Sequence, residues 1–219
     1  MRSIGPVDAQ MASLCGALLK VTGVNSCGVM MTTSSGQGVT AHATDAQARA
    51  VEDLQHTLGE GPGVAASQSG AAVLVPDLSD SHDVILERWP TFAREAVDIG
   101  IHAAFAFPLL LGTAPIGALS LYRNEPGQLS TEQASRSWLT AEVVALTLAD
   151  QADQVPVETE NLDPMRVHQA AGMVMVQLGV SIDEALLRLR ATAFSQGMTV
   201  DELADAVVQR RQRISKGDG

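Results

Sequence analysis

Aromatic residues are scarce in this 219-residue sequence, where four Phe, two Trp and one Tyr make up 3% of the residues. A surface that stacks several bases needs more rings than that, and so does an aromatic cage for a cofactor. Positive charge is scarce too, since 14 Lys and Arg stand against 25 Asp and Glu for a formal net charge of −11. That charge repels polyanions from the chain as a whole.

Cysteines and uninterrupted apolar runs are also few. Cys15 and Cys27 are the two cysteines and form no C-x-x-C pattern, which predicts ordinary thiols in a reducing compartment. The N-terminus lacks the apolar run of a signal peptide. Residues 99–122 carry no Asp, Glu, Lys or Arg, but Pro108 and Pro115 interrupt them, so we expect two buried strands rather than a membrane span. We therefore expect a cytoplasmic protein with no membrane partner.

The negative charge is confined to the first part of the chain. Residues 1–160 contain 7 Lys and Arg against 18 Asp and Glu, a net charge of −11, whereas residues 161–219 contain 7 of each. Residues 151–161, where these two parts meet, are rich in acids and have little periodicity. We expect one domain over residues 1–152, a linker over 153–162 and a second domain over 163–215.

Periodicity in the first part predicts a domain of mixed helices and strands. The expected helices cover residues 8–21, 46–56, 90–99 and 130–150, with a short one near 63–69, and the expected strands cover 27–33, 39–44, 72–75, 102–111 and 115–123. Ser130 and Gln133 form a capping box that begins the long last helix. This order fits an α+β domain with a mostly antiparallel central sheet flanked by helices.

The second part predicts a small all-α domain of three helices. The first helix begins at Asp163 and Pro164 and ends at Gly179. The second begins at a capping box of Ser181 and Glu184 and ends at Gly197. The third begins at a capping box of Thr199 and Glu202 and ends near Arg213.

No pattern in the sequence indicates catalysis. The glycines of 59–63 follow a predicted helix, whereas a dinucleotide-binding loop follows a strand, so we expect a turn there. Asp77, Asp80, His82 and Asp83 have no spacing that would make them converge on a metal ion. We expect no catalytic residue, no metal and no cofactor.

Several helices carry more apolar surface than one buried face needs. The long helix has a heptad-like seam and a second face of Leu139, Val143 and Leu146, and Leu187 continues a second stripe on a later helix. We expect a homodimer, with burial under the first domain as the alternative for the C-terminal stripe. The residues expected at dimer or coupling contacts are Trp138, Ala141, Ala145, Leu148, Ala170, Gly172 and Leu187.

Arginines gather near the C-terminus, and two interpretations stay open. Arg210, Arg211 and Arg213 could complement the negative end of the last helix. They could instead form a phosphate-contacting patch with other arginines of the same domain.

Three segments of the second part, 166–179, 181–190 and 199–208, resemble an ANTAR domain. The resemblance implies a three-helix RNA-binding module that binds paired stem-loops of nascent transcripts and prevents termination, usually as a dimer. With this in view, the residues expected to face RNA are Arg166, Gln169, Arg188, Arg190, Phe194, Arg210, Arg211 and Arg213.

The first part resembles a GAF domain of the type that precedes ANTAR domains in actinobacterial regulators. The matching segments are 58–62, 75–78, 88–92, 107–109 and 116–119. The resemblance implies the mixed fold described above and a sensor of an unidentified small-molecule ligand or of redox state.

Two departures from the family patterns matter. Ala171 stands where ANTAR domains often have Lys, and Gly63 stands where GAF domains often have Cys. We place Ala171 on the flank of the apolar stripe, so that a lysine there would reach water and tighten RNA binding. We expect a non-enzymatic, signal-responsive antiterminator. The alternative is a dimerising protein-interaction regulator without RNA binding; a GAF-like sulfoxide reductase would need reactive cysteines, which Cys15 and Cys27 are not expected to be.

Overall fold

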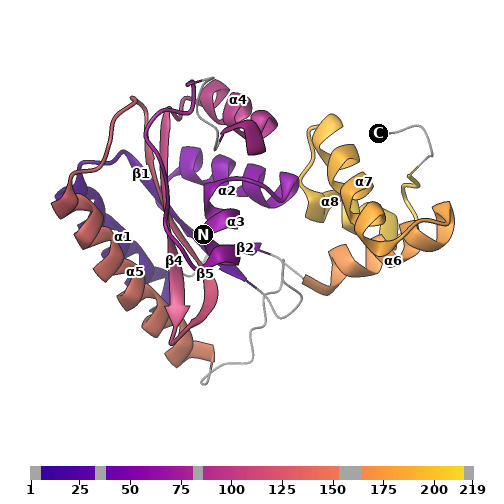
Figure 1. Cartoon of the computed structure of the whole chain (residues 1–219). Helices are drawn as coiled ribbons and strands as arrows, with labels where there is room; N and C mark the ends of the chain where they lie inside the picture. Colours follow the sequence, from indigo (N-terminus) through magenta and orange to yellow (C-terminus); the bar gives the residue numbers. More distant parts are fainter. Residues whose placement is uncertain (1–5, 33–37, 81–85, 153–163, 215–219) are drawn as a thin grey trace.

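The computed structural model describes residues 6–32, 38–80, 86–152 and 164–214. Figure 1 shows two domains side by side, a sheet with helices on both faces and a group of helices without a sheet. The expected fold classes, α+β and then all-α, are confirmed. The predicted linker over 153–162 and the cap at Asp163 lie outside the described residues.

The first domain is built on a five-stranded sheet in the order β2-β1-β5-β4-β3, in which every neighbouring pair is antiparallel. The strands are β1 (Ser26–Thr32), β2 (Gly38–Ala43), β3 (Val73–Val75), β4 (Ala103–Leu111) and β5 (Ala114–Arg123). All five strands were predicted within a residue or two of these bounds.

Helices cover both faces of this sheet (Figure 1). One face carries α1 (Pro6–Thr22) and α5 (Thr131–Ala152). The other face carries α2 (Ala46–Leu58), α3 (Pro62–Ser69) and α4 (Pro90–Asp98), and a single 3₁₀ turn, Leu86–Arg88, precedes α4.

Alternation along the strands gives each face its own core, because successive strand residues point to opposite sides. Leu119 and Leu121 of β5 belong to the core under α1 and α5. Tyr122 belongs to the core under α2 and α4, and Ala118 packs with Ala66 of α3. Small side chains on this second face let α3 lie close to the sheet.

Helix α5 begins at the predicted capping box. The Ser130 amide donates to Gln133 Oε1 at 2.8 Å, and the Gln133 amide donates to Ser130 Oγ at 3.2 Å. These two bonds satisfy amides that have no partner within the helix.

The seam predicted on α5 packs inside its own domain. Ala141, Ala145 and Leu148 are buried in the core against the sheet, so they are not available as contacts to a second copy. Trp138 is 40% exposed and lies edge-to-face on Phe107, with ring centroids 5.6 Å apart. The other apolar face stays open, since Leu139, Val143 and Leu146 are 64%, 45% and 61% exposed.

The second domain consists of α6 (Pro164–Leu178), α7 (Ile182–Ser195) and α8 (Val200–Val208). The capping box of Thr199 and Glu202 is present in both directions. At the start of α7, Ser181 Oγ accepts the Glu184 amide, but the Glu184 carboxylate pairs with Arg188 instead of returning to the cap. Only half of that predicted capping box therefore forms.

The prediction that the third helix reaches Arg213 was wrong, because α8 ends at Val208. Arg210 adopts a φ of 57°, and the Arg211 amide donates back to the Ala206 carbonyl at 2.8 Å. The chain then folds back until Ile214 is buried, and Gln177 Nε2 donates to the Ile214 carbonyl at 2.6 Å. The sequence carries no Gly or Pro stop signal at this point, and burial of Ile214 offsets the strain of a left-handed arginine.

The placement of Ala171 on the flank of the apolar stripe was also wrong. Ala171 is 0% exposed and belongs to the core shared by α6, α7 and α8. A lysine at this position would have to displace packed side chains before its ammonium reached water.

Ala171→Lys is therefore expected to lower the free energy of unfolding by about 1–3 kcal/mol, because it overfills a packed site. The control is Gln169→Lys, which adds the same charge to an exposed position of α6. Urea unfolding followed by circular dichroism measures both variants. Equal stabilities of the two variants would contradict the burial of Ala171.

Candidate functional site

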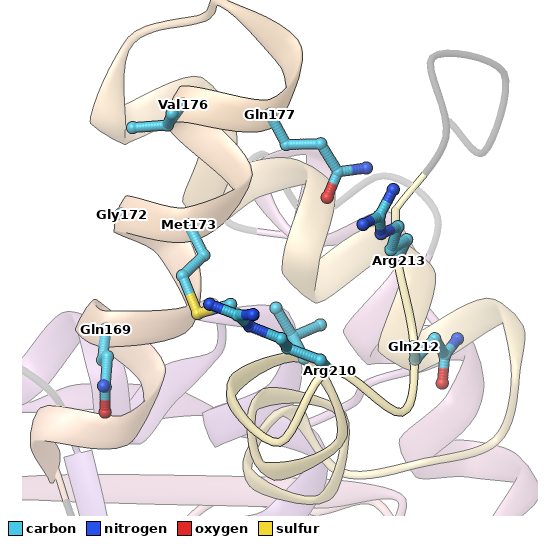
Figure 2. A pocket seen from close by; sticks show the side chains of 9 residues that line it. Gln169, Gly172, Met173, Val176, Gln177, Arg210, Gln212 and Arg213 are labelled. Atoms are coloured by element: carbon cyan, nitrogen blue, oxygen red, sulfur yellow. The ribbon is translucent and has the colours of Figure 1, made fainter.

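An open groove of about 660 Å³ lies on the second domain between α6 and the tail that follows α8. Gln169, Met173 and Gln177 line it from α6, and Arg210 and Arg213 line it from the tail. In Figure 2, Arg210 points across the groove toward Met173, and Arg213 lies near Gln177. The groove therefore joins polar and apolar side chains of a helix to two cations of the returning chain.

The two arginines of the groove have no acidic partner among the described residues. None of the described residues that line the groove is a carboxylate. Within the described part of the chain, neither Arg210 nor Arg213 forms an ion pair. Two uncompensated guanidinium groups in a protein of net charge −11 make this groove a local site of attraction for an anion.

The other arginines of the domain are mostly neutralised. Arg166 Nη1 lies 2.9 Å from Asp205 Oδ1, and Arg188 Nη2 lies 2.8 Å from Glu184 Oε1. Arg211 is exposed and donates through Nε to Gln209 Oε1 at 2.9 Å. Of the residues predicted to face RNA, the structure thus gathers Gln169, Arg210 and Arg213 in one groove, which Arg211 does not line.

Arg190 and Phe194 lie elsewhere, on α7. The guanidinium of Arg190 lies against Gly59 at the end of α2, where a Cβ atom would overlap it. Burial at this contact lowers the pKa of Arg190 from its ordinary value. Arg190 therefore faces the first domain and not RNA. For this residue, the structure agrees with the alternative that the second apolar stripe of α7 is buried under the first domain. Phe194 is half-buried.

The remaining residues predicted at dimer or coupling contacts are divided between core and surface. Ala170 is buried in the core of the second domain. Gly172 lines the groove, and Leu187 is 67% exposed. Of these three residues, Leu187 alone keeps an apolar side chain open to a partner.

Helix α2 connects the two domains, because it packs on the sheet and also contacts α7 and α8. His56 Nε2 lies 2.9 Å from Asp201 Oδ2 of α8, with side chains 13% and 27% exposed. The sequence does not show which elements this second face of α2 contacts.

A buried polar cluster lies between α2 and β5, and no motif in the sequence pointed to it. Tyr122 donates its hydroxyl to Glu52 Oε1 at 2.7 Å, and Gln55 Nε2 donates to the Tyr122 oxygen at 3.0 Å. Gln55 Oε1 accepts the Gly63 amide at 2.7 Å. Gly28 of β1 is required here, because a Cβ at that position would collide with the Glu52 side chain. The helical spacing of Ala48, Glu52 and Gln55 was the available signal.

Glu52 is the strongly perturbed acid of this cluster. Burial raises the pKa of Glu52 from 4.5 to about 7, although the hydrogen bond from Tyr122 opposes the rise. Its second oxygen, Oε2, has no hydrogen-bond partner among the described residues. The carboxyl therefore sits near the midpoint of its titration at neutral pH.

The two cysteines come together in the core under α1. Both are free and 0% exposed, and they belong to the same core cluster. The neighbouring Cys15 thiol and then burial raise the pKa of Cys27. Neither thiol is open to a substrate, as a sulfoxide reductase would require.

Neither a metal cluster nor a single membrane-spanning helix occurs among the described residues. No group of three or more His, Cys, Asp and Glu there is arranged to hold a metal ion, and two of the four loop residues considered above, His82 and Asp83, lie outside this part. No single helix in the same part is long and apolar enough to cross a membrane. One bent pair of helices, Arg166–Leu178 with Ile182–Ser195, meets these criteria of length and composition only when the two helices are taken together.

Comparison with known families divides the chain at the same place as the charge. Residues 6–149 match the GAF domain family, and residues 165–208 match the ANTAR domain family. A search of curated proteins finds no match.

Solved structures support the fold of the first domain. A domain of a two-component sensor histidine kinase protein from Sinorhizobium meliloti 1021 superposes with a TM-score of 0.53 at 13% identity, over 71% of this chain and 100% of that one. The GAF domain region of a membrane protein from Geobacter sulfurreducens PCA gives 0.54 at 15% identity, over 66% and 93%. The GAF domain of an Acinetobacter phosphoenolpyruvate-protein phosphotransferase gives 0.54 at 11% identity, over 69% and 87%. At these identities the likeness concerns the fold alone.

The raised pKa of Glu52 predicts a pH-dependent stability. Between its ordinary pKa of 4.5 and the folded value of about 7, the folded state keeps the proton that the unfolded chain releases, so stability falls as pH rises. Glu52→Gln should remove this fall and stabilise the protein above neutral pH by up to ~3 kcal/mol.

Urea unfolding between about pH 5 and about pH 8 measures the effect. Glu125→Gln, at an exposed position after β5, is the control and should keep the wild-type profile. A Glu52→Gln profile parallel to wild type would show that Glu52 titrates normally.

Proposed function

The chain belongs to the GAF domain family and carries an ANTAR domain behind it, and from this premise we propose that it is a signal-responsive RNA-binding regulator. ANTAR domains are RNA-binding antiterminator modules and GAF domains are sensors. In our proposal the ANTAR domain binds stem-loops of nascent transcripts in the cytoplasm and prevents termination, and the GAF domain responds to a small molecule or holds a dimer.

The observation that carries this proposal is the groove with Arg210 and Arg213. RNA stem-loops present phosphates at regular spacing and unpaired bases at the loop. The two guanidinium groups supply phosphate contacts, and Gln169 and Gln177 supply hydrogen-bonding groups for base edges or ribose hydroxyls. Val176, which is 78% exposed, offers apolar surface beside them. With so few aromatic residues, electrostatics and shape rather than stacking would provide the affinity.

Helix α2 supports a route by which the GAF domain could control the ANTAR domain. One face of α2 carries Glu52 and Gln55 of the buried cluster, and its C-terminal end carries His56 and Gly59 at the contact with α7 and α8. A ligand or proton that moves the cluster would shift the same helix that holds the second domain. We propose this helix as the coupling element between sensor and output.

RNA binding is expected to depend on the arginines of the groove. The double variant Arg210→Gly with Arg213→Gln removes both charges, and glycine adopts the left-handed conformation of position 210 without strain. The slope of log affinity against log salt should become shallower by about 0.7 for each single-strand phosphate that the variant no longer neutralises.

Filter binding with a two-hairpin RNA over a range of salt concentrations measures this slope. Arg136→Gln is the matched control, since it removes an exposed cation from α5 of the first domain. If the double variant and the control give the wild-type slope, the groove is not the RNA site.

A homodimer through α5 forms the second part of the proposal. Leu139 and Leu146 are 64% and 61% exposed, and they flank a groove of about 380 Å³ that also contains Leu110 and Leu111 of β4. This face lies on the side of the molecule away from α6, α7 and α8 (Figure 1). A second copy would cover it without touching the groove on the second domain.

Leu139→Glu with Leu146→Glu is expected to convert the dimer to a monomer, because four carboxylates would be buried in a symmetric contact. Light scattering on the full chain at micromolar concentration measures the mass. Ser69→Glu adds the same charge to an exposed position of α3, on the opposite face of the sheet from α5, and should leave the dimer intact. A wild-type mass that stays monomeric as concentration rises would refute the dimer.

The alternative function is a dimerising regulator that binds protein rather than RNA. Ala171, in place of the Lys common in ANTAR domains, and the acidic first domain favour it. The burial of Ala171 weakens the first of these points, because position 171 does not face the groove. Absence of RNA binding by a wild-type protein that is dimeric would favour this alternative.

A further inference from the structure

A small polar cavity of about 70 Å³ lies where the two domains meet. Its lining comes from both of them: Thr32 of β1, Gln55 and His56 of α2, and Ser67 of α3 on the GAF side, and Arg190 of α7 on the ANTAR side. The space is that of about two water molecules or one small ion, at about 30 Å³ per water. It is separate from the groove that we assign to RNA.

Two polar atoms of this lining are buried without a partner. Arg190 Nε and Thr32 Oγ1 are shielded from solvent, and neither has a hydrogen bond within the described residues. A buried guanidinium donor without an acceptor is unfavourable, because it has lost water and gained nothing in return. Both atoms belong to residues that line the same cavity, so one bound group could satisfy them together.

Of the other polar groups of the lining, Gln68 of α3 is exposed to solvent, and the buried ones are already engaged. Gln55 uses its amide on Tyr122 and Gly63, and Ser67 Oγ donates to the Val64 carbonyl at 2.8 Å. His56 lies 2.9 Å from Asp201, so that this nearby carboxylate is paired with histidine. What remains buried is one cation and one hydroxyl, and none of the described residues of the lining contributes a carboxylate to balance the cation.

We propose that this cavity binds a small oxyanion, a phosphate or a small carboxylate, between the two domains. The guanidinium of Arg190 holds it by a charge-assisted hydrogen bond from Nε, and the Thr32 hydroxyl donates a second hydrogen bond. Because one donor comes from each domain, the bound anion favours the docked arrangement over a separated one. The proposal does not depend on whether the ANTAR domain binds RNA.

Thermal unfolding of the full chain, with the anion concentration varied, tests the proposal. Inorganic phosphate and acetate are added in separate series against chloride at the same ionic strength, so that the two ligand chemistries are distinguished. We expect a saturable rise in the unfolding temperature with at least one of them, and isothermal titration calorimetry should give the same dissociation constant. Arg190→Gln should weaken that binding by about tenfold or more, the scale of one charge-assisted hydrogen bond.

One control and one further site variant separate the site from general effects of charge and strain. Arg188→Gln removes an arginine that pairs with Glu184 on the outer side of the same helix, and it should keep the anion response. Thr32→Val keeps the shape of the cavity without the hydroxyl and should weaken the response.

A glycine pair covers the case in which Arg190→Gln does not fold. Gly59 and Gly70 both end helices with φ near +69° and +68°, but a Cβ at Gly59 overlaps Arg190, whereas one at Gly70 meets only Leu110 at 3.8 Å. Gly59→Ala should therefore lose the anion response and Gly70→Ala should keep it, at equal backbone strain.

The outcomes decide the proposal in either direction. Loss of the response in Arg190→Gln and Gly59→Ala, with retention in Arg188→Gln and Gly70→Ala, supports the site. A wild-type protein that responds to neither anion beyond chloride would show a cavity filled by water only. A response that survives in both Arg190→Gln and Gly59→Ala would place the anion elsewhere. Either of these two results overturns the proposal.

Discussion

The hydrogen bond from the Tyr122 hydroxyl to the buried Glu52 carboxyl fixes helix α2 on the sheet, and both domains depend on the position of that helix. Gln55 extends the same network to the Gly63 amide, which positions the start of α3. One helical turn further on, His56 and Gly59 meet the second domain at Asp201 and Arg190. A change in the protonation or surroundings of Glu52 therefore acts on a helix that contacts both the sheet of the first domain and the helices of the second.

The contact between the domains includes a polar pair and a buried guanidinium, and these suit a regulated interface. Polar contacts such as the pair of His56 with Asp201 stabilise a docked arrangement only modestly, because partial exposure to water screens them. The Arg190 guanidinium, buried with an unsatisfied Nε, is the least favourable element of this contact. An interface with such an element responds to anything that satisfies it, whereas an apolar interface of the same size would not.

The distribution of charge separates two kinds of arginine in the ANTAR domain. Arg166 and Arg188 are paired with carboxylates of their own domain, so their charges are neutralised at its surface. Arg210 and Arg213 lie on a tail that turns back along α6, and no acid accompanies them within the described residues. The turn at Arg210 and the burial of Ile214 thus place cations over a groove instead of at the end of a helix.

Local signals in the sequence determined most of the secondary structure and both folds. Alternation and helical spacing predicted all five strands and the order of the elements, because these periods reflect which side of each element is buried. The caps at Ser130 and Thr199 could also be predicted from the sequence, because a capping box joins residues that are three positions apart. The end of α8 was not readable, because it depends on Ile214 and Gln177, which are distant in sequence.

Only the tertiary structure decided which apolar and charged faces meet. Periodicity shows that a face is apolar, but it does not show whether that face packs on the sheet, as Ala141 and Ala145 do, or stays open, as Leu139 does. In the same way, the sequence places Arg190 beside other cations, and the fold turns it against Gly59 of another domain. Burial and charge pairing are properties of groups brought together across long separations, so they follow from the packing of the elements rather than from any local pattern.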